Sequence, residues 1–294
     1  MKLEKLNYSS YLKVPELLSL QQEISQPAHH DEMFFIIIHQ AAELWFKEML
    51  HETEALIQAL RANSISRALK TLRRLTAVMD LQVRQINLLS TLTPVEFAGF
   101  RDHLRPASGF QSVQFRMLEF AFGVRDDFFL KFFAGAPEAL ESLKDWKDRP
   151  NVHDEFTACL RQHAPRPVAL LPDDSELMSQ LVEIYENPGE NYHWVLLCEA
   201  LIDFDEKFAQ WRSNHVLMVG RTIGFKPGTG GSSGYQFLQS RLEFRFFPEL
   251  WAVRMKIGTP YASALAGAGE TAAAAGALPT EGPAPRSGQC PFGH

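Results

Sequence analysis

Long stretches of the chain repeat apolar residues at the three- and four-residue spacing of an amphipathic α-helix. The clearest stretch runs from Asp31 to about Ala62 and contains no Gly or Pro. Its first turn holds Asp31 and Glu32, where carboxylates meet the positive end of the helix dipole. A second stretch runs from about Ile65 to Leu89. These patterns predict two long consecutive helices.

Shorter helical patterns follow, separated by turn signals. Thr93 can cap a helix that has Pro94 at its first position, and "RPASGFQS" is typical of a turn. A helix is expected next from about Gly109 to Phe122. Another begins in "DDSELMSQLVEIYEN", where Ser175 gives only a partial capping box because Met178 stands in place of Glu.

The longest late pattern runs from about Glu190 to Gly220 and is followed by the glycine-rich "GTGGSSG". The next segment, "YQFLQSRLEFRFFPELWAVR", predicts a helix broken at Pro248 and then a short one. Ala, Gly and Pro dominate residues 261–294, which predicts a disordered tail. We find no convincing strand, repeat or linker, so residues 1–260 are predicted to form a single all-α domain.

Composition narrows the class of protein. The chain has 294 residues, 46% of them hydrophobic, and can bury a substantial core. A net charge of -6 argues against nucleic-acid or anionic-membrane partners. No run resembles a transmembrane helix or the core of a signal peptide. Three widely separated cysteines suit neither a disulfide framework nor a zinc site. We expect a reduced, cytoplasmic protein.

His215 lies in the apolar stretch "WRSNHVLMVG". A lone histidine of this kind is commonly a satisfied helix residue. Trp211, one turn earlier, can support the imidazole. The apolar surroundings suit a macrocycle bound through one axial imidazole better than zinc, which needs three or four ligands.

The glycine-rich loop after His215 allows three interpretations. A phosphate-binding loop would need a preceding strand and a Lys after the last glycine, whereas Lys226 precedes the glycines here. A plain flexible connection is the second. The third is a loop that closes on a ligand, because its glycines let the backbone approach and Thr229, Ser232 and Ser233 offer hydroxyls.

His39 lies in the very apolar helical stretch "FFIIIHQAAELWF", with Phe35 four residues before it and Glu43 four residues after it. One interpretation is a core histidine that is hydrogen-bonded to Glu43. The other is a polar group that projects into an aromatic cavity.

Arg101 follows Phe97 and Phe100 and can present its planar guanidinium to a carboxylate in an apolar pocket. The alternative is a surface arginine paired with Asp102 or Asp127.

Five segments taken together resemble the tryptophan 2,3-dioxygenase family. They are "NYSSYL", "PAHHDEMFFIIIHQAAELWFK", "LTPVEFAGFRDHLRPASGFQSVQFR", "WRSNHVLMVGRTIG" and "KPGTGGSSGYQFL", and they occur in order along nearly the whole chain up to the tail. The resemblance implies an all-helical, haem-binding homotetramer built as a dimer of dimers. It also implies ferrous haem b as cofactor and O₂ as co-substrate. The implied reaction cleaves the indole C2–C3 bond of L-tryptophan to give N-formylkynurenine, the first step of tryptophan degradation.

The resemblance also implies cofactor and interface roles. His215 corresponds to the axial haem ligand, Trp211 to a residue that supports it, and Ser108 to a small polar residue above the haem. The first 15 residues correspond to a segment that contacts the neighbouring subunit's pocket, through Tyr8, Tyr11 and Leu12.

On the substrate side, the resemblance implies that His39 hydrogen-bonds the indole N–H and that Phe35 lies beside the ring. Arg101 corresponds to the clamp on the substrate carboxylate. Thr229 corresponds to a contact with the ammonium and carboxylate groups. Position 97 departs from the family pattern, because Phe97 lacks a tyrosine hydroxyl.

Two other functions fit the same residues. Relatives in secondary metabolism resemble this family and insert one oxygen atom into tryptophan or an analogue, giving an oxindole-type product. A haem sensor without turnover is the third possibility, but it would have no use for an amino-acid clamp.

Overall fold

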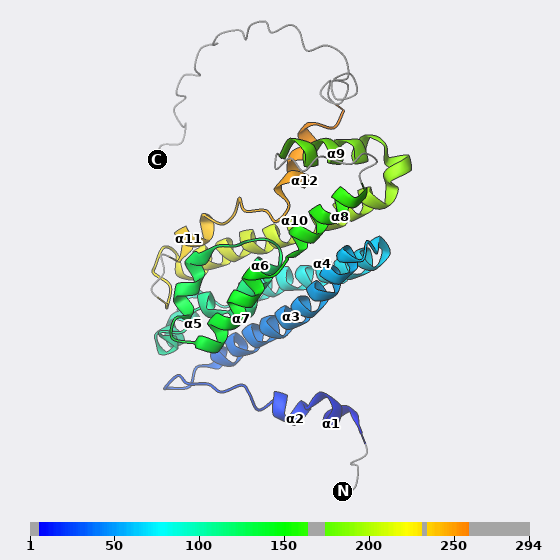
Figure 1. Cartoon of the computed structure of the whole chain (residues 1–294). Helices are drawn as coiled ribbons and strands as arrows, with labels where there is room; N and C mark the ends of the chain where they lie inside the picture. The colour runs from blue at the N-terminus through cyan, green and yellow to red at the C-terminus, as the bar shows by residue number, and fades with distance from the viewer. Residues whose placement is uncertain (1–5, 164–173, 231–233, 259–294) are drawn as a thin grey trace, which may run out of the picture.

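The computed structural model describes residues 6–163, 174–230 and 234–258. Within these ranges the chain is helical and has no strand, as predicted. Three long helices run side by side (Figure 1): α3 (His30–Arg61), α4 (Ile65–Leu89) and α10 (Pro188–Ile223). Helix α4 packs against both of the others. None of the described helices is long and apolar enough to cross a membrane.

The remaining elements are shorter. Between α4 and α10 come α5 (Pro94–Phe100), η1 (Arg101–Leu104), η2 (Gly109–Gln111), α6 (Val113–Ala121), η3 (Asp127–Phe133), α7 (Pro137–Asp148), α8 (Val152–His163) and α9 (Asp174–Glu186). After α10 come α11 (Tyr235–Gln239), α12 (Pro248–Ala252) and η4 (Val253–Met255). Two short N-terminal helices, α1 (Tyr8–Leu12) and α2 (Val14–Leu17), lie beyond α3, apart from the other helices (Figure 1).

Local sequence signals explain several helix boundaries. The Thr93 side chain accepts a hydrogen bond from the Glu96 backbone N–H at 3.3 Å, which forms the expected cap of α5. The helix predicted from Gly109 begins later, because Ser112 accepts from the Phe115 N–H at 3.2 Å and so caps α6. The sequence patterns did not single out α7 or α8.

The segment after the glycine-rich loop differs from its prediction. Helix α11 ends at Gln239, and Pro248 does not break a helix but starts α12 at its first position. A buried carboxylate holds the irregular backbone between them. Asp205 of α10 accepts hydrogen bonds at Oδ2 from the Phe246 and Phe247 N–H groups, at 3.0 and 3.2 Å, and from the Trp251 indole at 3.0 Å.

Replacing Asp205 should destabilise the fold. Asp205→Ala leaves three donors without their buried acceptor, so we expect a loss of about 3 kcal/mol in the free energy of unfolding, since each unsatisfied buried group costs about 1–3 kcal/mol. Urea denaturation followed by circular dichroism measures the loss. Asp203→Ala, at an exposed position of the same helix, is the matched control. Equal midpoints for both variants would contradict this role of Asp205.

The core is strongly aromatic. Phe122 stacks on Phe204 with ring centroids 4.5 Å apart, and Phe208 meets Phe246 edge-on at 4.8 Å. A smaller cluster lies toward α5 and consists of Ile38, Leu89, Leu92 and Phe100. Helix α10 contributes to the main core through Phe204 and Phe208, and further along it carries the residues of the site described next.

Candidate active site

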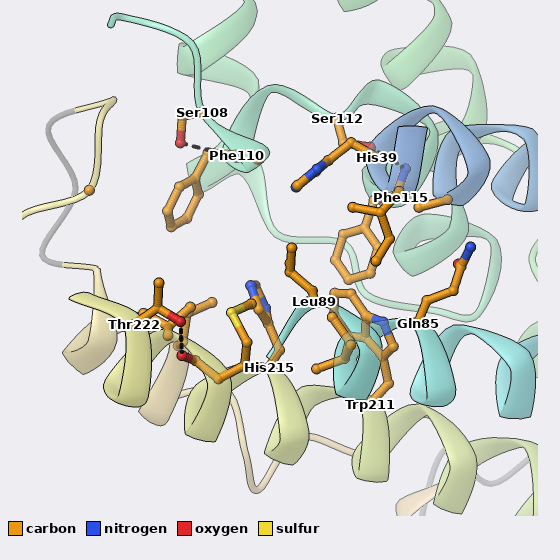
Figure 2. A pocket seen from close by; sticks show the side chains of 18 of the residues that line it. His39, Gln85, Leu89, Ser108, Phe110, Ser112, Phe115, Trp211, His215 and Thr222 are labelled. Atoms are coloured by element: carbon orange, nitrogen blue, oxygen red, sulfur yellow. Dashed lines mark hydrogen bonds between the residues drawn. The ribbon is translucent and has the colours of Figure 1, made fainter. Parts of the chain in front are cut away.

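A cavity of about 320 Å³ lies between α3, α4, α6 and α10 and the loop that follows α10 (Figure 2). Its volume is in the range of small-molecule sites. Most of its wall is apolar, with several phenylalanines and Trp211. The polar groups that line it are therefore candidates for chemistry.

His215 enters the cavity from α10. Its ring centroid is 5.1 Å from that of Trp211, one turn earlier, and Trp211 packs on Phe115 at 5.0 Å. Burial lowers the pKa of His215 to about 4, and the neighbouring His39 and Arg116 act in the same direction. The imidazole is therefore neutral at pH 7, with a lone pair available to a metal.

His39 enters from α3, on the opposite wall from His215 (Figure 2). Its Nδ1 lies 2.7 Å from the Phe35 carbonyl oxygen, so Nδ1–H is the donor and Nε2 is left as an acceptor. Burial lowers the pKa of His39, although the Phe35 hydrogen bond and Glu43 partly oppose this. The Phe35 ring centroid lies 4.1 Å from the imidazole. A neutral acceptor thus stands beside an aromatic surface.

His39 and Glu43 are not hydrogen-bonded to each other. Glu43 accepts hydrogen bonds from Ser112 Oγ at 2.6 Å and from Gln114 Nε2 at 2.8 Å. His39 is bonded to a backbone carbonyl instead. The interpretation in which Glu43 satisfies a core histidine is therefore wrong.

Arg101 and Thr229 join two segments at the mouth of the cavity. The Arg101 guanidinium donates to the Pro227 carbonyl, and Thr229 Oγ1 donates to the Ala107 carbonyl at 2.5 Å. The proposed surface partners of Arg101 are engaged elsewhere, Asp102 with Arg105 at 3.1 Å and Asp127 with Lys147. Arg101 thus lines the cavity rather than forming a surface ion pair.

Ser108 lies where the glycine-rich loop touches the turn before α6. Its Oγ accepts from the Phe110 N–H at 3.4 Å (Figure 2), and a Cβ on Gly230 would lie 2.6 Å from the Ser108 Cβ. Only glycine fits such an approach. The hydroxyls of Ser232 and Ser233 lie outside the described residues.

Tyr8, Tyr11 and Leu12 do not line this chain's own cavity. They lie on α1, which is apart from α4 and α10 (Figure 1), and the two tyrosines are 78% and 70% exposed. The predicted tail, residues 261–294, lies outside the described residues.

Sequence reasoning missed a buried ionic cluster on the cavity wall. Arg116 and Glu119 of α6 pair with each other, and Arg212 of α10 donates to Glu119 at 3.0 Å. The signal was present in "VQFRMLEFAF", because two opposite charges three residues apart interrupt an otherwise apolar pattern.

The side chains that could bind a metal ion decide which kind of cofactor fits the cavity. Across residues 6–163, 174–230 and 234–258, no three His, Cys, Asp or Glu side chains gather as a metal site. A single imidazole in an apolar wall cannot hold a bare ion, which needs several ligands. It can hold an iron that already has four ligands from a flat macrocycle. The residues present therefore fit haem.

Fold and cavity define an all-helical protein with one imidazole from α10 and a second from α3 on opposite walls of an aromatic cavity, which Arg101 also lines. The family model described as "Tryptophan 2,3-dioxygenase" matches residues 2–165 and 170–257. The chain belongs to the tryptophan 2,3-dioxygenase family, which confirms the resemblance seen in the five sequence segments.

Curated relatives agree with this assignment. The chain is 44% identical over 263 residues to "Tryptophan 2,3-dioxygenase" of Arthrobacter sp. (strain FB24), which covers 86% of this chain and 93% of the relative. It is 42% identical over 277 residues to the protein of the same name in Xanthomonas campestris pv. campestris (strain B100), covering 90% and 93%. Most of each chain is matched, so the similarity extends over the whole helical domain.

Proposed function

We propose that this protein is a haem-dependent tryptophan 2,3-dioxygenase. It opens the indole C2–C3 bond of L-tryptophan and places both atoms of O₂ in N-formylkynurenine, so the reaction needs no external reductant. The observation that carries the proposal is the pair of neutral imidazoles on opposite walls of an aromatic cavity with Arg101 at its mouth. The haem, when bound, supplies the activation of O₂ that side chains cannot perform.

On one wall, His215 would hold the haem iron as its single protein ligand. Trp211 packs against the imidazole from one turn away and keeps its orientation. Ser108 lies on the cavity wall beside the loop and would offer the haem a small polar side chain.

On the other wall, Nε2 of His39 accepts the indole N–H, which orients C2 and C3 of the substrate. The Phe35 ring supplies an apolar surface for the indole. Arg101 clamps the carboxylate, and the Thr229 hydroxyl contacts the ammonium and carboxylate groups. Tryptophan has an apolar indole ring, a carboxylate and an ammonium group, and the site offers a partner for each of them.

The fate of the oxygen atoms tests the reaction. Full-length protein is loaded with ferrous haem, given L-tryptophan under ¹⁸O₂, and the product mass is measured. We expect two labelled atoms in the product. One labelled atom would establish the monooxygenase with its oxindole-type product. An O₂ complex that yields no product from tryptophan or its substituted analogues would establish a haem sensor.

The close contact between Gly230 and Ser108 predicts a loop-positioning effect. In Gly230→Ala the new methyl group must push the loop away from Ser108, so Thr229 no longer reaches the substrate. We expect KM for tryptophan to rise roughly tenfold, the equivalent of about 1.4 kcal/mol, with haem content unchanged. Gly135→Ala is the matched control, since a Cβ there meets open space. An unchanged KM would contradict the contact of Thr229 with substrate.

The assembly belongs to the same proposal: a homotetramer, built as a dimer of dimers, in which residues 1–15 complete the neighbouring pocket. The exposed Tyr8 and Tyr11 and the isolation of α1 from this chain's cavity support it. Deleting residues 1–12 should lower kcat/KM about 100-fold through substrate misplacement, while haem content stays the same.

Mixed oligomers make this test specific. The deletion variant keeps its own cavity, whereas His39→Ala keeps its N-terminal segment. Co-assembly of the two should restore activity above that of either variant alone, because the intact segment of one chain reaches the intact cavity of the other. Failure to restore activity in verified mixed oligomers would contradict the shared pocket.

A further inference from the structure

The loop of residues 224–230, called the Thr229 loop below, rests on the turn before α6. Thr229 Oγ1 donates to the Ala107 carbonyl at 2.5 Å. A Cβ on Gly230 would lie 2.6 Å from the Ser108 Cβ, so the loop backbone lies directly against that side chain. The place of the Thr229 hydroxyl therefore depends on how this turn is held relative to α3.

Residues 108–112 form one hydrogen-bonded unit within the turn. The Ser108 N–H donates to Gln111 Oε1 at 3.1 Å, and the Gln111 N–H donates to the Ser108 carbonyl at 2.9 Å. The Ser112 N–H donates to the Gly109 carbonyl at 3.2 Å. A displacement of Ser112 is therefore passed on to Ser108, and through it to the Thr229 loop.

Glu43 ties this unit to α3, one turn after His39. Ser112 Oγ donates to Glu43 Oε1 at 2.6 Å and accepts from the Phe115 N–H at 3.2 Å as the cap of α6. Gln114 Nε2 donates to Glu43 Oε2 and to the Glu43 carbonyl, each at 2.8 Å. Both carboxylate oxygens of Glu43 are thus bonded to the start of α6.

The link needs an acceptor at both oxygens of residue 43. Gln114 cannot reverse its amide, because its carbonyl oxygen would then meet the Glu43 carbonyl. Glu43→Gln replaces one acceptor by an NH₂ donor. That donor would face either the Gln114 NH₂ group or the Ser112 hydroxyl, whose proton would then lose its acceptor. Glu43→Gln, although nearly the same shape, should therefore loosen the link.

We propose that Glu43 is a positioning residue, which sets the distance between His39 on α3 and the Thr229 loop. The inference rests on the proposed function, since it takes tryptophan as the ligand whose two ends these residues bind. Glu43 lines the cavity, but its oxygens are bonded to Ser112 and Gln114, so it acts through the turn.

Two ligands separate the two ends of the site. L-Tryptophan has the ring and both charged groups, whereas 3-methylindole has only the ring. Full-length, haem-loaded ferrous protein is kept under argon, so that neither ligand is oxidised, and each dissociation constant is measured. In Glu43→Gln the constant for tryptophan should rise severalfold, up to roughly tenfold. The constant for 3-methylindole should be unchanged, because His39 and Phe35 bind the ring from α3 itself.

Thr229 identifies the route of the effect. Thr229→Val removes the hydroxyl that Glu43 places, so Glu43→Gln should add little to it, because residues that act through one contact are not additive. Glu43→Asp keeps both oxygens but is one methylene shorter, so its loss should lie between those of wild type and Glu43→Gln. Glu48→Gln is the matched control, since that side chain lies on the same helix and forms no hydrogen bond or ion pair with any described residue.

Steady-state kinetics in air distinguish positioning from folding. A misplaced loop raises KM for tryptophan and leaves kcat nearly unchanged, because it weakens ground-state and transition-state binding alike. A variant that merely folds less well has fewer active molecules, so it loses kcat and keeps KM. We expect the first pattern for Glu43→Gln and wild-type values for Glu48→Gln.

Failure of this inference can be told from failure of the proposed function. The role of Glu43 is overturned if Glu43→Gln binds tryptophan as wild type does, weakens both ligands equally, or adds its full effect to that of Thr229→Val; wild-type turnover leaves the proposed function standing. A wild-type chain that gives no product in air, but shows the expected changes under argon, supports Glu43 and overturns the dioxygenase reaction. A wild-type chain that binds no tryptophan overturns both.

Discussion

His215→Ala should remove the protein ligand of the haem iron and reduce turnover to background. Its imidazole is the one histidine side chain of α10 among the residues that line the cavity, and its lowered pKa keeps it neutral and ready to bind. Loss of a group that merely hydrogen-bonds a metal ligand typically costs about 10- to 100-fold, so removing the ligand should cost more. The Soret and visible bands of the ferrous protein measure the loss directly.

Added imidazole gives this prediction its control. The alanine leaves a space of the right shape in a site still flanked by Trp211, so free imidazole should bind the iron there and restore part of the normal ferrous spectrum. His163→Ala, at an exposed histidine whose ring lies 4.6 Å from that of Trp194, should leave the spectrum unchanged. A normal ferrous spectrum in His215→Ala would remove His215 from the role of ligand.

Arg101→Gln should weaken the use of tryptophan almost as severely. Breaking a buried charge pair of this kind costs about 2–5 kcal/mol, which corresponds to a loss of roughly 30- to 5,000-fold in kcat/KM. Arg101→Lys keeps the charge but loses the planar fork, so it should recover only part of that loss. Steady-state kinetics on the haem-loaded variants measure both effects.

Tryptamine, which lacks the carboxylate, identifies the cause. If Arg101 binds the carboxylate, Arg101→Gln should change the affinity for tryptamine much less than that for tryptophan. Equal losses for both ligands would instead point to Arg101 as a support for the loop through Pro227. Arg105→Gln serves as the control, because Arg105 occupies the same turn but pairs with Asp102 at the surface.

The sequence predicts the helices whose signals are local. The long helices α3 and α4 start and end within about a residue of their predicted limits, because their apolar spacing is uninterrupted. Between α11 and α12 the predicted helix is absent, because residues 240–247 have an irregular backbone held by Asp205, whose carboxylate accepts from N–H groups 41 and 42 residues later in the chain. No local pattern can report such a distant hydrogen-bond acceptor.

In the site, too, the sequence shows local features but not those that depend on tertiary packing. His39 and His215 stand out in the sequence because each is a polar residue within an apolar helical face. That they face each other depends on the packing of α3, α4 and α10, and was implied only by the family resemblance. The hydrogen bonds of Glu43 to Ser112 and Gln114 join residues about seventy positions apart, so their prediction would need the tertiary structure itself.

The hydrogen bond from Arg101 to the Pro227 carbonyl makes substrate capture an exchange reaction. With the proposed clamp, the incoming carboxylate takes over a donor that the chain itself was using, and Pro227 must find water or another partner. The measured affinity is then the difference between two bonded states, not the full strength of the ion pair. A change in the loop that strengthens its hold on Arg101 would act as an internal competitor and weaken tryptophan binding without touching the substrate.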